Sequence, residues 1–198
     1  MSVSPTSSTA ATPDGWARAE VDLARCRVLI HTKATGLLAR FAHNLEIEAT
    51  KLEVAARLDG ERWTAELRAP VRGMRVVGVL RGEGVHRDVL SRGDEEEIQR
   101  RIREQVFVGV ETVRVQADGE SPQHGQATVT LAGGRQTVAL RPSVKHEASG
   151  EVMVSGRCVL SLGRLGVPEV KGPLGAFRVF DDVEILYSFV VRRPADPS

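Results

Sequence analysis

The chain has 198 residues, of which 41% are hydrophobic, which is enough to close one core in a single domain. Its 27 basic and 26 acidic residues give a net charge of +1 and are intermixed, which argues against a general nucleic-acid binder with a concentrated basic face. Aromatic residues make up only 4%, so the core must be built from valine, leucine, isoleucine and alanine.

The two ends of the chain differ in composition from the rest. Residues 1–13 are dominated by Ser, Thr, Ala and Pro and lack the charged start and apolar stretch of a secretory signal. We therefore expect a disordered tail over 1–15 and a flexible tail over 193–198, with a single domain over 16–192. No run approaches the roughly 18 apolar residues that span a membrane, so we predict no transmembrane segment and a cytoplasmic protein.

Strand signals dominate the first part of the domain, from residue 16 to residue 80. Apolar and polar residues alternate there, which is the period of two of a strand with one buried face. The longest of these runs predicts a strand over residues 43–58. Asp59 and Gly60 then supply a hairpin turn signal before the next strand.

One segment breaks this alternation. Ser91 followed by Asp94 matches the capping box at the start of a helix. Apolar residues then recur every four positions, the spacing of a helical stripe: Ile98, Ile102 and Val106. The pattern predicts one short α-helix over about residues 92–106, and its narrow stripe indicates that it lies against the sheet surface.

Strands are predicted again from Val106 onward. The parity of the valines changes near Glu111 and Thr112, which predicts a β-bulge there. Pro142 interrupts a later strand and indicates an edge or a bulge. The last two strands, over 152–162 and 183–191, carry the clearest alternation in the chain, on either side of a Gly- and Pro-rich linker.

These elements together predict an all-β fold with one helix. Most links between strands are too short for a crossover helix, so the strands are antiparallel. A sheet of this size curls, and closing it into a barrel removes its exposed edges.

Three stretches carry a resemblance to a known family. They are residues 36–48, in which His43 opens a strand, residues 90–106 with the single helix, and residues 165–185 at the closing hairpin. In this order they resemble the YceI-like family, also described as polyisoprenoid-binding proteins. The resemblance implies an antiparallel, lipocalin-like β-barrel of about eight strands with an elongated apolar interior. It also implies a bacterial protein and allows a homodimer.

The candidate ligand-binding residues are those whose place in the alternating pattern directs the side chain into the barrel or its mouth. They are His43, Leu45, Ile47, Ala65, Leu67, Val129, Leu140, His146, Val154, Cys158, Ile185, Tyr187 and Phe189. Space inside the barrel is expected next to the small inward residues, which are Ala49, Ala65, Ala127 and Gly156.

The five histidines have several possible roles. His43 and His146 share the parity of apolar neighbours, so each is either a satisfied interior histidine or a polar contact for a ligand head group. Together they could mark one polar end of an apolar cavity. The other three, His31, His86 and His124, lie among polar or turn residues and are expected to be exposed.

No catalytic or metal centre is predicted. The two inward histidines have no carboxylate on the same face, which is a weak metal signal. Cys26 and Cys158 lack a nearby histidine pattern and are expected to be buried thiols, neither zinc ligands nor a disulfide. Ser155 and Ser161 face outward without a nucleophile motif. We expect no catalytic residue, no cofactor and no metal.

The leading hypothesis is a non-enzymatic carrier that holds a long apolar ligand, an isoprenoid or a fatty acyl lipid, inside the barrel. A ligand-free barrel that acts as a protein-interaction or scaffold module is the first alternative. An enzyme that uses His43 and His146 at the mouth of a pocket is the second, although no acid–base pair can be assembled from the sequence.

Overall fold

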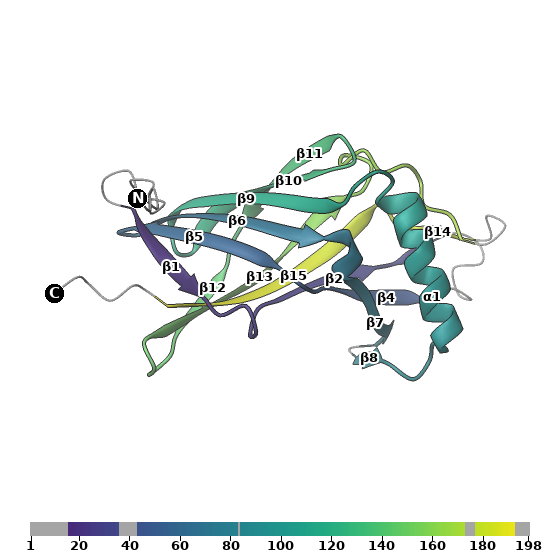
Figure 1. Cartoon of the computed structure of the whole chain (residues 1–198), viewed down its shortest axis with the longest axis horizontal. Coiled ribbons are helices and arrows are strands. Elements are labelled where there is room, and N and C mark those ends of the chain that lie inside the picture. Colours follow the sequence, from purple (N-terminus) through teal and green to yellow (C-terminus); the bar gives the residue numbers. More distant parts are fainter. Residues whose placement is uncertain (1–15, 36–42, 83, 173–176, 193–198) are drawn as a thin grey trace, which may run out of the picture.

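The computed structural model describes residues 16–35, 43–82, 84–172 and 177–192 (Figure 1). The predicted tails, 1–15 and 193–198, lie outside the described residues. The strands are β1 (Ala17–Val21), β2 (Arg27–Thr32), β3 (Ala34–Thr35), β4 (Asn44–Ala49), β5 (Glu53–Asp59), β6 (Arg62–Pro70), β7 (Met74–Arg81), β8 (Gly84–His86), β9 (Thr112–Ser121), β10 (His124–Leu131), β11 (Gly134–Leu140), β12 (Ser143–His146), β13 (Glu151–Ser161), β14 (Arg178–Val179) and β15 (Asp182–Arg192). The helix α1 (Arg92–Arg101) continues directly into a π-helical turn (Ile102–Val106), and a 3-10 turn (Val71–Gly73) separates β6 from β7.

Most of these strands are pieces of longer, bent strands. Four bent pairs (β1–β2, β4–β5, β6–β7 and β11–β12) and four single strands (β9, β10, β13 and β15) together make eight. The predicted strand over 43–58 is one such pair, since Lys51 has a positive φ of 57° and the backbone N–H of Thr50 donates to Gly73 O at 2.8 Å. The predicted break at Pro142 is confirmed between β11 and β12.

The strand pairings run around a complete circuit, and all of them are antiparallel. β15 pairs with β1 on one side and β13 on the other. From β1 the order continues through β5, β6, β9, β10 and β11. β12 follows β11 in the chain and pairs with β13, which closes the circuit. The prediction of an antiparallel, lipocalin-like barrel of about eight strands with one short helix is confirmed.

The helix begins as predicted and lies elsewhere than predicted. The Ser91 Oγ accepts from the Asp94 N–H at 3.2 Å, while the Asp94 carboxylate accepts from the Ser91 N–H at 2.9 Å. α1 lies across one end of the barrel, beside the ends of β4 and β7 (Figure 1). Its apolar stripe lines the interior and not the outer surface of the sheet. At this end β7 pairs with β4, whereas β6 before it pairs with β9. β7 and β9 therefore separate, and the helix covers the gap between them.

The strand predicted from Val106 and the bulge near Glu111 and Thr112 are both wrong. Residues up to Val106 belong to the π-helical turn, whose end is marked by a hydrogen bond from Phe107 N–H to Ile102 O at 3.1 Å. The next strand begins only at Thr112. The side chains of Val106, Phe107 and Val110 pack against the buried cluster described next, so burial in this turn replaces burial in a strand.

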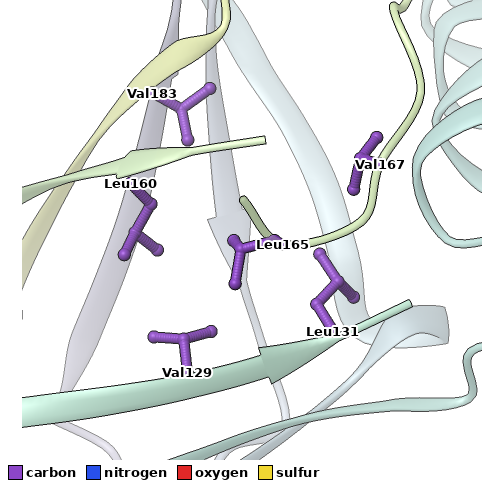
Figure 2. Close-up of a cluster of buried hydrophobic side chains, with 6 residues drawn as sticks. All are labelled: Val129, Leu131, Leu160, Leu165, Val167 and Val183. Carbon is purple, nitrogen blue, oxygen red and sulfur yellow. The ribbon is translucent and has the colours of Figure 1, made fainter. Parts of the chain in front are cut away.

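The same end of the barrel contains a packed core. A loop after β13 brings Leu165 next to Leu131, and four further residues complete the cluster (Figure 2): Val129, Leu160, Val167 and Val183. Leu165 is only 2% exposed. On the same side, the buried Gln136 side chain accepts from the Ser161 N–H at 2.9 Å and so links β11 to β13. The cluster therefore packs the wall of the barrel at this end, and all of its residues except Val167 also line the interior cavity.

Candidate ligand-binding cavity

The barrel interior contains an apolar cavity of about 710 Å3. This volume falls within the roughly 300–1,000 Å3 typical of small-molecule sites. The inward residues of β15 run from Val183 to Val191, a path of about 26 Å at ~3.3 Å per residue. The cavity is therefore large enough for one ligand and elongated along the strands.

A row of alanines accounts for much of the empty space. Strand register places five alanines side by side across β1, β5, β6, β9 and β10: Ala19, Ala56, Ala65, Ala117 and Ala127. Each alanine side chain ends at its β-carbon, so the space that a leucine or phenylalanine side chain would occupy stays empty. Because the row crosses neighbouring strands, these empty spaces adjoin one another and form continuous free volume along the inner face of one wall of the barrel.

All the residues proposed from sequence as ligand contacts lie along this cavity. They are His43, Leu45, Ile47, Ala65, Leu67, Val129, Leu140, His146, Val154, Cys158, Ile185, Tyr187 and Phe189. Whether they contact a ligand stays a prediction. The sequence interpretation missed the contribution of the helix, whose Ile98, Ile102 and Val106 also line the cavity. The four-residue stripe was the available signal, and it was interpreted as packing against the sheet surface.

The two cavity-lining histidines lie at opposite ends of the barrel. Next to His43, Leu45 pairs with Thr32 on β2, near the first residues of β15. His146 pairs with Val152 on β13, near the last residues of β15. Both side chains are exposed. The prediction that they could mark one polar end of the cavity is therefore wrong.

The outer face of the barrel holds a histidine that was expected to be exposed. His31 is half-buried, and its Nε2 lies 2.8 Å from a Glu46 carboxylate oxygen. Glu46 is itself only 7% exposed. His31 is an outward neighbour of the cavity-lining Ile30 and Thr32, so this pair stabilises the wall and does not reach the interior. His86 and His124 are exposed, as predicted.

The two ends of the cavity differ in chemistry. Charged side chains border the end covered by α1: Lys33, Asp94, Glu97, Arg101 and Lys171. Trp63 lines the cavity at the other end, where its Nε1 donates to Ser121 O at 2.9 Å and its ring occupies the space beside Gly119 and Gly125. A β-carbon at either glycine would clash with that ring. Charged groups thus gather at the α1 end, whereas the other end combines an aromatic cover with Glu61 and His146.

The middle of the cavity contains two ionisable groups, and both are neutral at neutral pH. Burial raises the pKa of the Cys158 thiol to about 11. Burial, with a smaller effect from Cys158, raises the pKa of Tyr187 to about 12. A thiol and a phenol held neutral are poor nucleophiles and poor bases. The arrangement favours binding of a neutral, apolar molecule.

Neither cysteine is joined to another residue, and no metal-binding group is evident where the chain is described. Cys26 and Cys158 are free thiols, and Cys26 Sγ donates to Asp22 O at 3.1 Å. Within the described ranges, no three His, Cys, Asp or Glu side chains gather as metal ligands do. In the same residues no helix is long and apolar enough to cross a bilayer.

An antiparallel barrel of eight strands around an elongated apolar cavity defines a lipocalin-like class of protein. No protein-family profile and no curated protein matches the sequence. The fold is similar to the crystal structure of BcnA from Burkholderia cenocepacia, with a TM-score of 0.59 and 14% identity over 86% of this chain and 99% of that one.

It is also similar to a polyisoprenoid-binding domain from Saccharophagus degradans implicated in plant cell wall breakdown. Here the TM-score is 0.57 at 9% identity, over 89% of this chain and 98% of that one. The chain therefore has a YceI-like fold, and the resemblance seen in the sequence is confirmed for the fold.

Proposed function

We propose that this protein is a non-enzymatic carrier that holds a long apolar ligand, an isoprenoid or a fatty acyl lipid, in the barrel. The observation that carries the proposal is the cavity of about 710 Å3, whose walls are almost entirely aliphatic and aromatic. The similarity to a domain described as polyisoprenoid-binding supports the same ligand class. The neutral Cys158 and Tyr187 support binding without chemistry.

The size of the cavity is sufficient for useful affinity. A ligand of roughly two dozen non-hydrogen atoms, at ~0.3 kcal/mol each, gains about 7 kcal/mol on binding. That free energy corresponds to a dissociation constant in the low-micromolar range. The gain comes from removing apolar surface from water, so it depends on ligand length more than on any single contact.

The first experiment combines native mass spectrometry with analysis of an organic extract of the purified protein. The proposal predicts a mass excess that matches one extracted lipid, or saturable binding of a fluorescent fatty acid to protein stripped of lipid. A double variant, Ala65→Leu with Ala117→Leu, narrows the cavity at the middle of the alanine row and should weaken probe binding. Ala55→Leu, on the exposed face of β5, is the matched control and should bind normally.

Absence of both extracted lipid and saturable probe binding would refute the carrier function. A stable protein partner recovered under the same conditions would then favour the interaction or scaffold module. A cytoplasmic location and a homodimer are further parts of the proposal. Fractionation of the source cells and light scattering of the purified protein test them.

A further inference from the structure

The only tyrosine of the chain lies halfway along the cavity wall. Tyr187 is the middle inward residue of β15, and each end of the inward series, Val183 and Val191, is about 13 Å away at ~3.3 Å per residue. In the strand register it is flanked by Gly156 on β13 and Val28 on β2. The position is as far from either end of the cavity as the strand allows.

The hydroxyl of this tyrosine is buried without a hydrogen-bond partner among the described residues. The ring leans over Gly156, where an added β-carbon would clash with the hydroxyl oxygen. It also stacks on Phe189, with ring centroids 6.1 Å apart. Buried hydroxyls almost always have a partner, because an unpaired one loses its hydrogen bonds to water without compensation.

A phenylalanine would avoid this cost at the same position, and the neighbouring inward residue of β15 is a phenylalanine. No hydrogen bond to a described residue holds the hydroxyl over Gly156, so only packing opposes rotation of the ring towards the open cavity. A ligand oxygen at this depth would therefore gain a hydrogen bond that the empty protein lacks.

We propose that Tyr187 donates a hydrogen bond to a neutral oxygen acceptor, such as a carbonyl, carried part-way along an otherwise apolar ligand. This inference rests on the proposed carrier function and specifies its ligand class. The ring turns from Gly156 towards the cavity axis when such a ligand enters. A carboxylate at this depth is disfavoured, because one hydrogen bond does not compensate for burying a charge.

Two probes of equal length test the inference: a straight-chain hydrocarbon and a ketone with its carbonyl at mid-chain. Both are measured by displacement of a fluorescent fatty acid from protein stripped of lipid. The wild-type protein should bind the ketone about tenfold more tightly than the hydrocarbon, the difference expected for one buried hydrogen bond. Tyr187→Phe should bind the two probes equally while its Tm stays the same or rises.

Phe189→Leu is the matched control, because it alters the stacked neighbour without touching a polar atom. It should lower the affinity for both probes by a similar factor and so leave the preference for the ketone unchanged. A ketone preference that survives in Tyr187→Phe would overturn the role of the hydroxyl while leaving the carrier function standing. Equal displacement by the two probes from wild-type protein would overturn this inference alone, whereas the absence of saturable binding of the fluorescent fatty acid itself would overturn the carrier function, and this inference with it.

Discussion

Replacing Ala65 by leucine distinguishes a hollow barrel from a solid one. Ala65 lies at the centre of the alanine row, between Ala56 on β5 and Ala117 on β9. Its side chain faces the cavity, so the added carbons of leucine would enter empty space. In a barrel with a filled interior the same carbons would displace neighbouring side chains.

The two cases differ in the sign of the change in stability. Leucine adds three carbons to alanine, which are worth up to about 2 kcal/mol at ~0.8 kcal/mol per buried CH2. Overpacking a filled core instead costs about 1–3 kcal/mol. We expect Ala65→Leu to gain about 1–2 kcal/mol, which raises Tm by roughly 2–8 °C in a protein of this length.

Urea denaturation of protein stripped of lipid measures this change as a shift in midpoint at constant slope. Ala55→Leu adds the same atoms to the exposed face of the neighbouring strand and should change stability by less than about 0.5 kcal/mol. A loss of more than about 1 kcal/mol in Ala65→Leu alone would refute the hollow interior, because overpacking is the mechanism that costs this much there.

Three further predictions concern the ends of the barrel. Leu165→Ala should cost about 3–5 kcal/mol in the same denaturation assay, because Leu165 is 2% exposed in the packed end. Hydrogen bonds from Arg25, and with them Ser149 and Arg192, lower the pKa of Glu151 to about 2 from its usual 4.5. The stabilisation by Glu151 should therefore be complete above pH 4.5 and be lost as the pH falls towards 2, so that the Tm of Glu151→Gln falls less than that of wild type over this range. In Trp16→Phe protein the remaining Trp63 lines the cavity, so a brominated fatty acid should quench its fluorescence.

Each of these has an outcome that would contradict it. A cost below about 1 kcal/mol for Leu165→Ala would mean that the loop after β13 does not pack as described. Parallel acid profiles for wild type and Glu151→Gln would show that this carboxylate does not link the strand ends. Quenching that is equally strong with a water-soluble bromide would place Trp63 outside the cavity.

Short-range patterns in the sequence were sufficient to predict most of the strands and the start of the helix. The alternation of apolar residues reflects which face of a single strand is buried, and the capping box of Ser91 and Asp94 lies within one turn of helix. Both signals are contained in a few consecutive residues and could therefore be recognised in the sequence. The bends could not, because Lys51 takes a positive φ where Thr50 bonds to Gly73, more than twenty positions away. The position of the helix depended on the gap between β7 and β9, which exists only in the folded barrel.

The properties that suggest a function depend on register, which no local pattern records. Ala56, Ala65 and Ala117 are ordinary inward residues in their own strands, and they leave a continuous empty space only because the strand pairings align them. The same holds for Tyr187, whose hydroxyl is buried because Gly156 lies opposite and leaves room for the ring. A one-residue slip in register would turn these side chains to the outer face and remove the cavity. Sequence parity could therefore select the inward residues, while the size of the cavity and the unpaired hydroxyl within it required the alignment of the strands.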